Sequence, residues 1–213
     1  MVQSLITGSN RGIGAALAAE AETRGHSILR ATRTGQGGDI FFDISDPKQV
    51  EQAMAAVNQP IDIVINNAGI IGPDSPTTDM DWTAMAHTFA VNVAGALAVS
   101  TACLDNLRCS DSPRILTISS QMAYMGYAKS DRISYRASKA AVNKVMQGLA
   151  TDLYPDGISV VLVDPGWVQT DMGGAKAELT PAEVAAGIID LAERVTLEHT
   201  GKFFRWTGEE RAF

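Results

Sequence analysis

Short, almost continuously apolar segments that alternate with longer segments of helical period most constrain how this chain can fold. The runs IDIVIN and SVVLVD are typical of strands buried on both faces of a parallel sheet. We predict strands at residues 2–7, 27–32, 40–43, 61–66, 114–119, 159–163 and 202–205. We predict helices at residues 13–24, 47–57, 81–107, 135–153 and 181–195.

This alternation implies right-handed crossovers between parallel strands. The expected architecture is therefore α/β, a Rossmann-like, doubly wound and mostly parallel seven-stranded sheet with helices on both faces. We find no repeat and no linker long enough to divide the chain, so we expect one domain over residues 1–213.

Charge and hydropathy exclude several classes of partner. The net charge is −7, which disfavours nucleic acid or an anionic membrane as the main partner. The longest apolar helical stretch, residues 89–104, is interrupted by Asn92 and is shorter than the ~20 residues that span a bilayer. With no signal peptide visible and no disulfide framework suggested by Cys103 and Cys109, we expect a soluble, cytoplasmic protein.

Metal binding and serine hydrolysis find no support in the sequence. His26, His87 and His199 are scattered, without the spacing of metal ligands, so we predict no metal site. No G-x-S-x-G motif is present, which disfavours a nucleophile elbow.

A glycine-rich turn follows the first predicted strand and opens the first predicted helix. In LITGSNRGIG, Gly8, Gly12 and Gly14 would allow the backbone to turn tightly and to approach a pyrophosphate at the helix N-terminus. A glycine-rich turn without a ligand is the alternative. The absence of a G-K-[ST] ending disfavours a P-loop nucleotidase.

Tyr135 and Lys139 lie four residues apart in a predicted helix and therefore share one of its faces. A free tyrosine has a pKa near ~10 and is a poor proton shuttle at neutral pH. A neighbouring ammonium favours phenolate, so we expect Lys139 to lower the pKa of Tyr135.

Four ordered stretches, TGSNRGIG, NNAG, Tyr135-x-x-x-Lys139 and DPGWVQTDM, resemble the short-chain dehydrogenase/reductase family. The segments YRASKAAVN, PGWVQTDMGG and GKFFRWTGE are most similar to its sniffer-type carbonyl reductase and C-factor-like subgroup. The resemblance implies an oxidoreductase that exchanges hydride between a nicotinamide cofactor and a carbonyl or secondary alcohol.

By this resemblance, Tyr135 is the acid/base and Ser120 orients the reacting oxygen, with Ser119 as the alternative. Lys139, together with the positive nicotinamide of the oxidised cofactor, lowers the pKa of the tyrosine, and it also holds the nicotinamide ribose. Asn92 matches the asparagine that holds a water linked to the lysine, although a polar residue that merely interrupts an apolar helix face is the alternative.

The resemblance also assigns the cofactor site. Arg33 follows the second predicted strand where an acid would select NAD, and Arg11 is a second cation, so NADP is favoured over NAD. Either arginine could instead be a solvated surface charge. The expected cofactor-binding residues are Gly8, Ser9, Asn10, Arg11, Gly12, Ile13, Gly14, Arg33, Asp43, Ile44, Asn67, Ala68, Gly69, Tyr135, Lys139, Pro165, Gly166, Val168 and Thr170.

The remaining expectations concern substrate and partners. Residues 121–133 form a loop that we expect to shape the substrate mouth, and the short segment 173–180 predicts a weakly enclosed site. A small-molecule carbonyl or alcohol is the expected substrate, and a homodimer is possible. The alternative from another class is an NADP-binding signalling or redox-sensing module with incidental catalysis.

Overall fold

The strands form one continuous eight-stranded sheet in the order β3-β2-β1-β4-β5-β6-β7-β8. The computed structural model describes residues 1–35 and 37–213. The strands are β1 (Gln3–Thr7), β2 (Ser27–Thr32), β3 (Ile40–Phe41), β4 (Ile63–Asn66), β5 (Arg114–Ile118), β6 (Ser159–Asp164), β7 (Phe203–Arg205) and β8 (Glu210–Arg211).

Every neighbouring pair is parallel except β7 and β8, which are antiparallel. The predicted doubly wound α/β fold is therefore confirmed. The predicted count of seven strands is one too few, because β8 spans only Glu210–Arg211 and is too short to show a period in the sequence.

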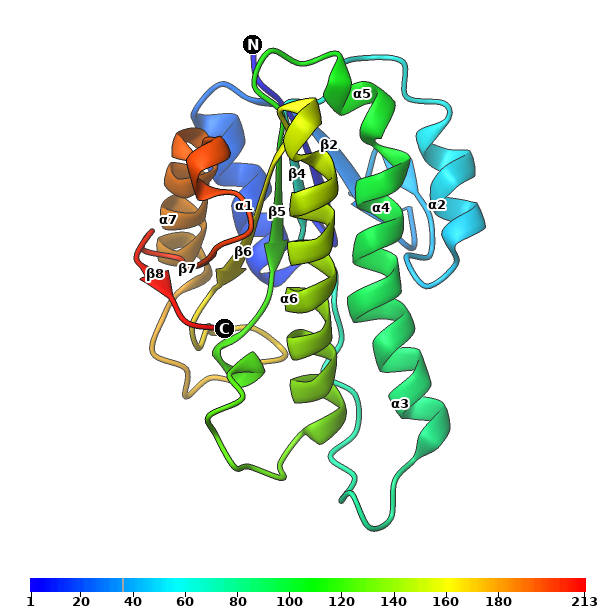
Figure 1. Cartoon of the computed structure of the whole chain (residues 1–213), viewed down its shortest axis with the longest axis vertical. Helices are drawn as coiled ribbons and strands as arrows, with labels where there is room; N and C mark the ends of the chain where they lie inside the picture. The colour runs from blue at the N-terminus through cyan, green and yellow to red at the C-terminus, as the bar shows by residue number, and fades with distance from the viewer. Residues whose placement is uncertain (36) are drawn as a thin grey trace.

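Helices cover both faces of the sheet, as Figure 1 shows. On one face, α1 (Gly12–Thr23) and α7 (Pro181–Arg194) pack on the sheet through apolar side chains such as Leu17 and Ile188. On the other face lie α2 (Pro47–Met54), α4 (Ala96–Ala102) and α6 (Ile133–Leu153), whose buried residues include Val50, Val99 and Met146.

The starts of α2 and α7 follow directly from the local sequence. Asp46 caps α2 by accepting from the backbone N–H groups of Lys48 and Gln49. Thr180 and Glu183 form a reciprocal capping box at α7. Pro47 and Pro181 follow the two caps, where the missing N–H has no helical partner to lose.

The single helix predicted at residues 81–107 is wrong in detail. The structure has α3 (Trp82–Phe89), the π-helix η1 (Ala90–Gly95), α4 and then α5 (Leu104–Arg108). The side chain of Asn92 bonds both backbone groups of Ile70, accepting from N at 2.9 Å and donating to O at 2.8 Å. Such a side-chain contact with another segment accompanies the widened turn, which sequence period does not reveal.

The helical run Trp82–Ala102 is 21 residues long and apolar enough to cross a membrane by length and composition. It is longer than the apolar stretch expected from the sequence. Of its most apolar window, 39% is buried, and Val91, Ala96 and Val99 belong to the hydrophobic core.

Two glycine substitutions test the packing of these helices. A Cβ at Gly95 would lie 2.6 Å from the Ile44 carbonyl oxygen, whereas a Cβ at Gly148 in α6 would meet nothing within 4 Å. We expect Gly95→Ala to lower the free energy of unfolding by about 1–3 kcal/mol through overpacking. Gly148→Ala should raise it by about 0.5–1 kcal/mol because alanine is the better helix former.

Urea unfolding of both variants measures these changes. Equal effects of the same sign at the two positions would contradict the close approach of η1 to Ile44.

Candidate active site

A cavity of about 1240 Å³ opens at the carboxyl ends of the parallel strands. All of the predicted cofactor-binding residues line it except Ser9, and so does Ser120. Open α/β sheets bind ligands at this edge, because the loops that follow neighbouring strands meet there.

The glycine-rich turn forms the floor at one end of the cavity. Gly8 and Gly12 have φ values of +66° and +55°, a region that residues with a Cβ rarely adopt. At Gly14, a Cβ would lie 2.1 Å from the Gly8 carbonyl oxygen, so α1 can begin directly against the turn only if this residue is glycine. The first amides of α1 are thereby presented to the cavity.

The start of α1 fits a bound dinucleotide phosphate, because its free amides and positive end suit an anion. The Ser9 hydroxyl is buried and, among the described residues, has no hydrogen-bond partner. Ser9 does not line the cavity, so we expect it to support the turn.

Strand β4 leads into a second turn, the NNAG stretch at residues 66–69, which Thr7 holds against β1. The Thr7 hydroxyl accepts from the backbone N–H groups of Asn67 and Ala68, each at 3.0 Å. The Asn67 amide in turn donates to the Thr7 carbonyl oxygen at 2.9 Å. Thr7 was not among the predicted site residues, although this residue stands directly before Gly8 at the end of the first strand.

The end of the cavity near β2 carries the two predicted cations. Arg33 lines the cavity and is exposed. Arg11 forms an ion pair with Asp171 at 2.9 Å, and the two side chains are 73% and 81% exposed. Such an exposed pair is worth little, so it leaves Arg11 able to exchange partners.

Asp43 also lines the cavity, and its carboxylate accepts from the N–H and hydroxyl of Ser45 at 2.9 and 2.7 Å. These hydrogen bonds lower the pKa of Asp43. Both bonds go to Oδ1 of Asp43, and Asp46 rather than Asp43 is the cap of α2. Asp43 therefore keeps its second oxygen for other partners.

Tyr135 and Lys139 extend from α6 into the other end of the cavity, with the Lys139 Nζ 5.6 Å from the centre of the tyrosine ring. Lys139 is buried and donates to the Ile118 carbonyl oxygen at 2.7 Å. Burial lowers the pKa of Lys139 to about 8.

The expectation that Lys139 and a positive nicotinamide together lower the pKa of Tyr135 concerns the cofactor-bound site and stays a prediction. Burial of the phenol raises its pKa to about 12, because a phenolate would lose its hydration. The Ser120 hydroxyl, as a hydrogen-bond partner, lowers this pKa, and the charge of Asp164 raises it further.

The two serines after β5 have different surroundings. The Ser119 hydroxyl is buried and donates to the Asn143 Oδ1 at 2.5 Å. Both serines line the cavity, but Ser120 is partly exposed, and its hydroxyl lies near enough to the Tyr135 phenol to lower the phenol's pKa. The geometry therefore favours Ser120 over the alternative, Ser119.

Asn92 is buried and does not line the cavity. Beyond its bonds to Ile70, its amide donates to the Ser138 hydroxyl at 3.0 Å, and that hydroxyl donates to the Tyr135 carbonyl oxygen. Asn92 thus connects η1, the segment after the second turn and α6. This placement makes it a positioning residue.

Residues 121–133 were expected to shape the mouth of the site, and residues 173–180 to leave it weakly enclosed. Of residues 121–133, only Gln121 and Met122 line the cavity. The segment before Thr180 forms turns and a single bridge between Val168 and Leu179, with no helix among its described residues. Trp167 is 46% exposed at the rim, and its indole N–H donates to the Gly173 carbonyl oxygen.

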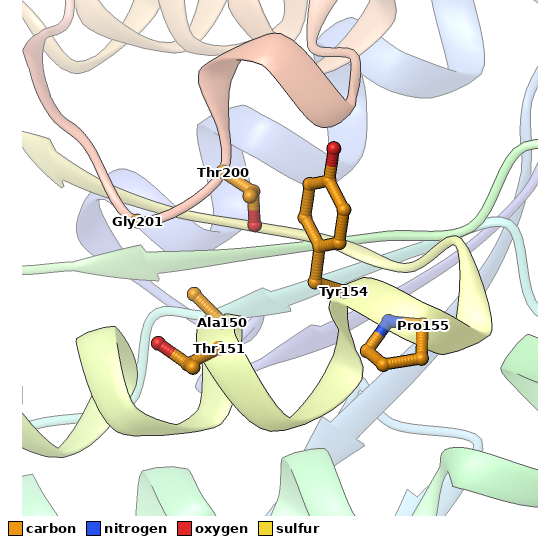
Figure 2. Close-up of a pocket in the computed structure, with 6 residues that line it drawn as sticks. All are labelled: Ala150, Thr151, Tyr154, Pro155, Thr200 and Gly201. Carbon is orange, nitrogen blue, oxygen red and sulfur yellow. The ribbon is translucent and has the colours of Figure 1, made fainter.

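A second, smaller hollow of about 390 Å³ lies at the carboxyl end of α6. Figure 2 shows the residues that line it: Ala150, Thr151, Tyr154, Pro155, Thr200 and Gly201. Nineteen helical steps separate its Tyr154 from Tyr135, roughly 28 Å at 1.5 Å per residue. Its lining carries no charged side chain, so we assign it no catalytic role.

These features define a doubly wound, dinucleotide-binding type of protein with a Ser–Tyr–Lys constellation at the carboxyl edge of its sheet. Residues 3–180 match the short chain dehydrogenase family. The chain belongs to that family, as its sequence motifs led us to expect.

Three known proteins illustrate the similarity. The C-signal of Myxococcus xanthus is 40% identical over 153 residues, which cover 71% of this chain and 92% of the relative. A short chain dehydrogenase from Burkholderia cenocepacia, solved in complex with NADP, is 27% identical with a TM-score of 0.85, covering 96% of this chain and 95% of that one. The carbonyl reductase Sniffer of D. melanogaster shares the fold over the whole of both chains, with a TM-score of 0.93 at 24% identity.

The contrast between the two serines leads to a stability prediction. Ser119→Ala leaves the buried Asn143 oxygen without its donor and should lower the free energy of unfolding by about 1–3 kcal/mol. Ser120→Ala removes the acceptor for the Met122 N–H at the start of a short 3₁₀ turn and the partly exposed partner of the Tyr135 phenol, so we expect a loss below about 1 kcal/mol. Chemical denaturation of both variants measures the difference. A larger loss of stability in Ser120→Ala than in Ser119→Ala would contradict this assignment of the two serines.

Proposed function

We propose that this chain is an NADP(H)-dependent oxidoreductase that exchanges a hydride between the nicotinamide and a carbonyl or secondary alcohol. One observation carries the proposal: Ser120, Tyr135 and Lys139 line the same cavity as the glycine-rich turn. Gly8 and Gly12 would hold the phosphates of a dinucleotide, and Tyr135 and Lys139 would face its nicotinamide.

The nicotinamide supplies the hydride in reduction and accepts it in oxidation. The protein supplies the proton. With a pKa raised to about 12, Tyr135 keeps its proton at neutral pH and is suited to donate it to a carbonyl oxygen. In oxidation the phenol must first lose its proton, which the ammonium of Lys139 and a positive nicotinamide favour.

Ser120 stabilises the same oxygen as negative charge develops on it, by presenting a second donor beside the phenol. Lys139 is held in place by the Ile118 carbonyl oxygen and has N–H donors left for a cofactor ribose. Asn92 fixes the π-helix and the start of α6, so it acts through Tyr135 and Lys139 without touching the substrate.

The proposed preference for NADP rests on the cations at the adenosine end. Arg33 follows β2, where an acidic residue would accept from the 2′-hydroxyl of NAD. In this proposal its guanidinium pairs with the 2′-phosphate, and Arg11 leaves Asp171 to join it. The Burkholderia relative that was solved with NADP supports this choice.

The similarity to a protein named C-signal favours a second candidate, a cofactor-binding signalling or redox-sensing module. A pure binding module needs no proton donor beside the nicotinamide, and the Ser120–Tyr135–Lys139 arrangement therefore favours the enzyme. The homodimer and the cytoplasmic location stay predictions.

Replacing the proposed proton donor tests the enzyme directly. Tyr135→Phe removes the transferable proton and should lower NADPH-dependent carbonyl turnover by about 10²–10⁴, with NADPH affinity nearly unchanged. Turnover and a fluorescence titration of NADPH measure the two effects. Tyr154→Phe, at an exposed phenol in the second hollow, is the matched control and should leave both unchanged.

Two outcomes would count against the proposal. Near-full turnover in Tyr135→Phe would show that Tyr135 is not the proton donor. Tight NADPH binding by the wild-type protein, without turnover on any aldehyde, ketone or quinone, would favour the sensing module.

The cofactor preference is tested by a change at Arg33. Arg33→Ala should raise the KM for NADPH by about tenfold or more, because a charge-assisted contact to the 2′-phosphate is lost, and should leave the KM for NADH unchanged. Arg30→Ala is the control, since Arg30 pairs with Glu22 at 2.6 Å and does not line the cavity. Equal losses with both cofactors would show that Arg33 does not read the 2′-phosphate.

A further inference from the structure

The carboxylate of Asp164 lies at the end of β6, between two loops of the site. Its Oδ1 accepts from the backbone N–H groups of Gln121 and Gly166, each at 3.0 Å. Gln121 directly follows Ser120, and Gly166 belongs to the segment that follows β6 and lines the cavity. One buried carboxylate therefore holds the backbone on both sides of the reaction centre.

Arg211 pairs with the other oxygen of Asp164 from the opposite end of the sequence. It lies on β8, the short antiparallel strand near the C-terminus that Figure 1 shows beside β7. The two side chains are 14% and 6% exposed, and the Arg211 guanidinium lies 5.2 Å from the centre of the Phe203 ring. A buried carboxylate needs such a cation, since an unpaired one is strongly destabilising.

Several elements bring polar or charged groups toward Tyr135. Lys139 faces the phenol from its own helix, the Ser120 hydroxyl faces it from the turn after β5, and Asp164 faces it from β6. Asn92 on η1 is neutral and bonds Ile70 and Ser138, and His87 on α3 lies near Asp43. Arg211 faces Asp164 and offsets its charge.

We propose that Asp164 and Arg211 are a positioning pair for the proposed reaction, through which the C-terminal β7–β8 hairpin holds the Ser120–Gln121 segment and sets the charge that faces Tyr135. Neither side chain touches substrate or cofactor in this proposal. The inference rests on the proposed function for its catalytic part, whereas the anchoring of the loops is independent of any activity.

The anchoring is tested by amide hydrogen exchange in the full-length protein. Asp164→Ala removes the shared acceptor and should speed exchange at Gln121 and Gly166 by about tenfold. Lys202→Met is the matched control, because Lys202 pairs with Glu210 at 3.2 Å on the same hairpin and makes no contact with Asp164. Unchanged exchange at both amides in Asp164→Ala would overturn the proposal, whether or not the wild-type protein reduces a carbonyl.

The charge is tested by the pH dependence of kcat/KM for carbonyl reduction, which falls as Tyr135 loses its proton. Asp164→Asn keeps an acceptor but removes the negative charge, and should lower the midpoint of this fall by about one pH unit. Arg211→Met keeps the length and the packing on Phe203 but leaves Asp164 uncompensated, and should raise the midpoint.

Both substitutions break the same ion pair, so a purely structural role predicts similar effects for the two variants. Shifts in the same direction, or none in either variant, would overturn the electrostatic role. Arg211→Lys restores a cation and should return the midpoint toward the wild-type value. A wild-type protein without turnover would instead contradict the proposed function, and the exchange experiment would still decide the anchoring.

Discussion

The parallel direction of β1, β4, β5 and β6 is the constraint on which the rest of this structure depends. Parallel strands place their carboxyl ends at one edge, so the turns that follow them must meet there. In this chain those turns contain the glycine-rich loop, the Asn67–Gly69 segment, Ser120 and the segment after Asp164. The direction of the strands alone therefore places residues that are far apart in sequence at the same edge of the sheet.

Helix α6 converts this shared edge into a reaction centre, and its attachment is unusually polar for a core helix. Lys139 donates to the end of β5, and Asn143 accepts from Ser119. Ser138 receives the amide of Asn92 from η1. Each of these buried groups has a hydrogen-bond partner, and such a network fixes the register of a helix more tightly than apolar contacts alone. The same packing buries the Tyr135 phenol and raises its pKa, so the phenol keeps at neutral pH the proton that the proposed reduction needs.

Much of the fold and of the cavity lining could be predicted because their signals are local. The glycine spacing, the buried strands and the helical spacing of Tyr135 and Lys139 are all properties of short segments. The features that these local patterns did not reveal depend on contacts between segments far apart in the sequence. The π-helix around Asn92 depends on the backbone of Ile70, and the direction of the Tyr135 pKa depends on burial that no spacing reveals. The Asp164–Arg211 pair joins residues 47 apart, one of them on a strand too short for any pattern.

In the proposed reaction, a nicotinamide bound in this cavity would supply hydride to a carbonyl carbon while Tyr135 gives the proton to its oxygen. The most direct measurement uses NADPH carrying deuterium at the transferable position, with a carbonyl substrate, followed by mass spectrometry of the alcohol formed. We predict one deuterium on the carbinol carbon in the wild-type product. Product that forms without deuterium on that carbon would contradict it, as would bound NADPH that never transfers the label to any carbonyl.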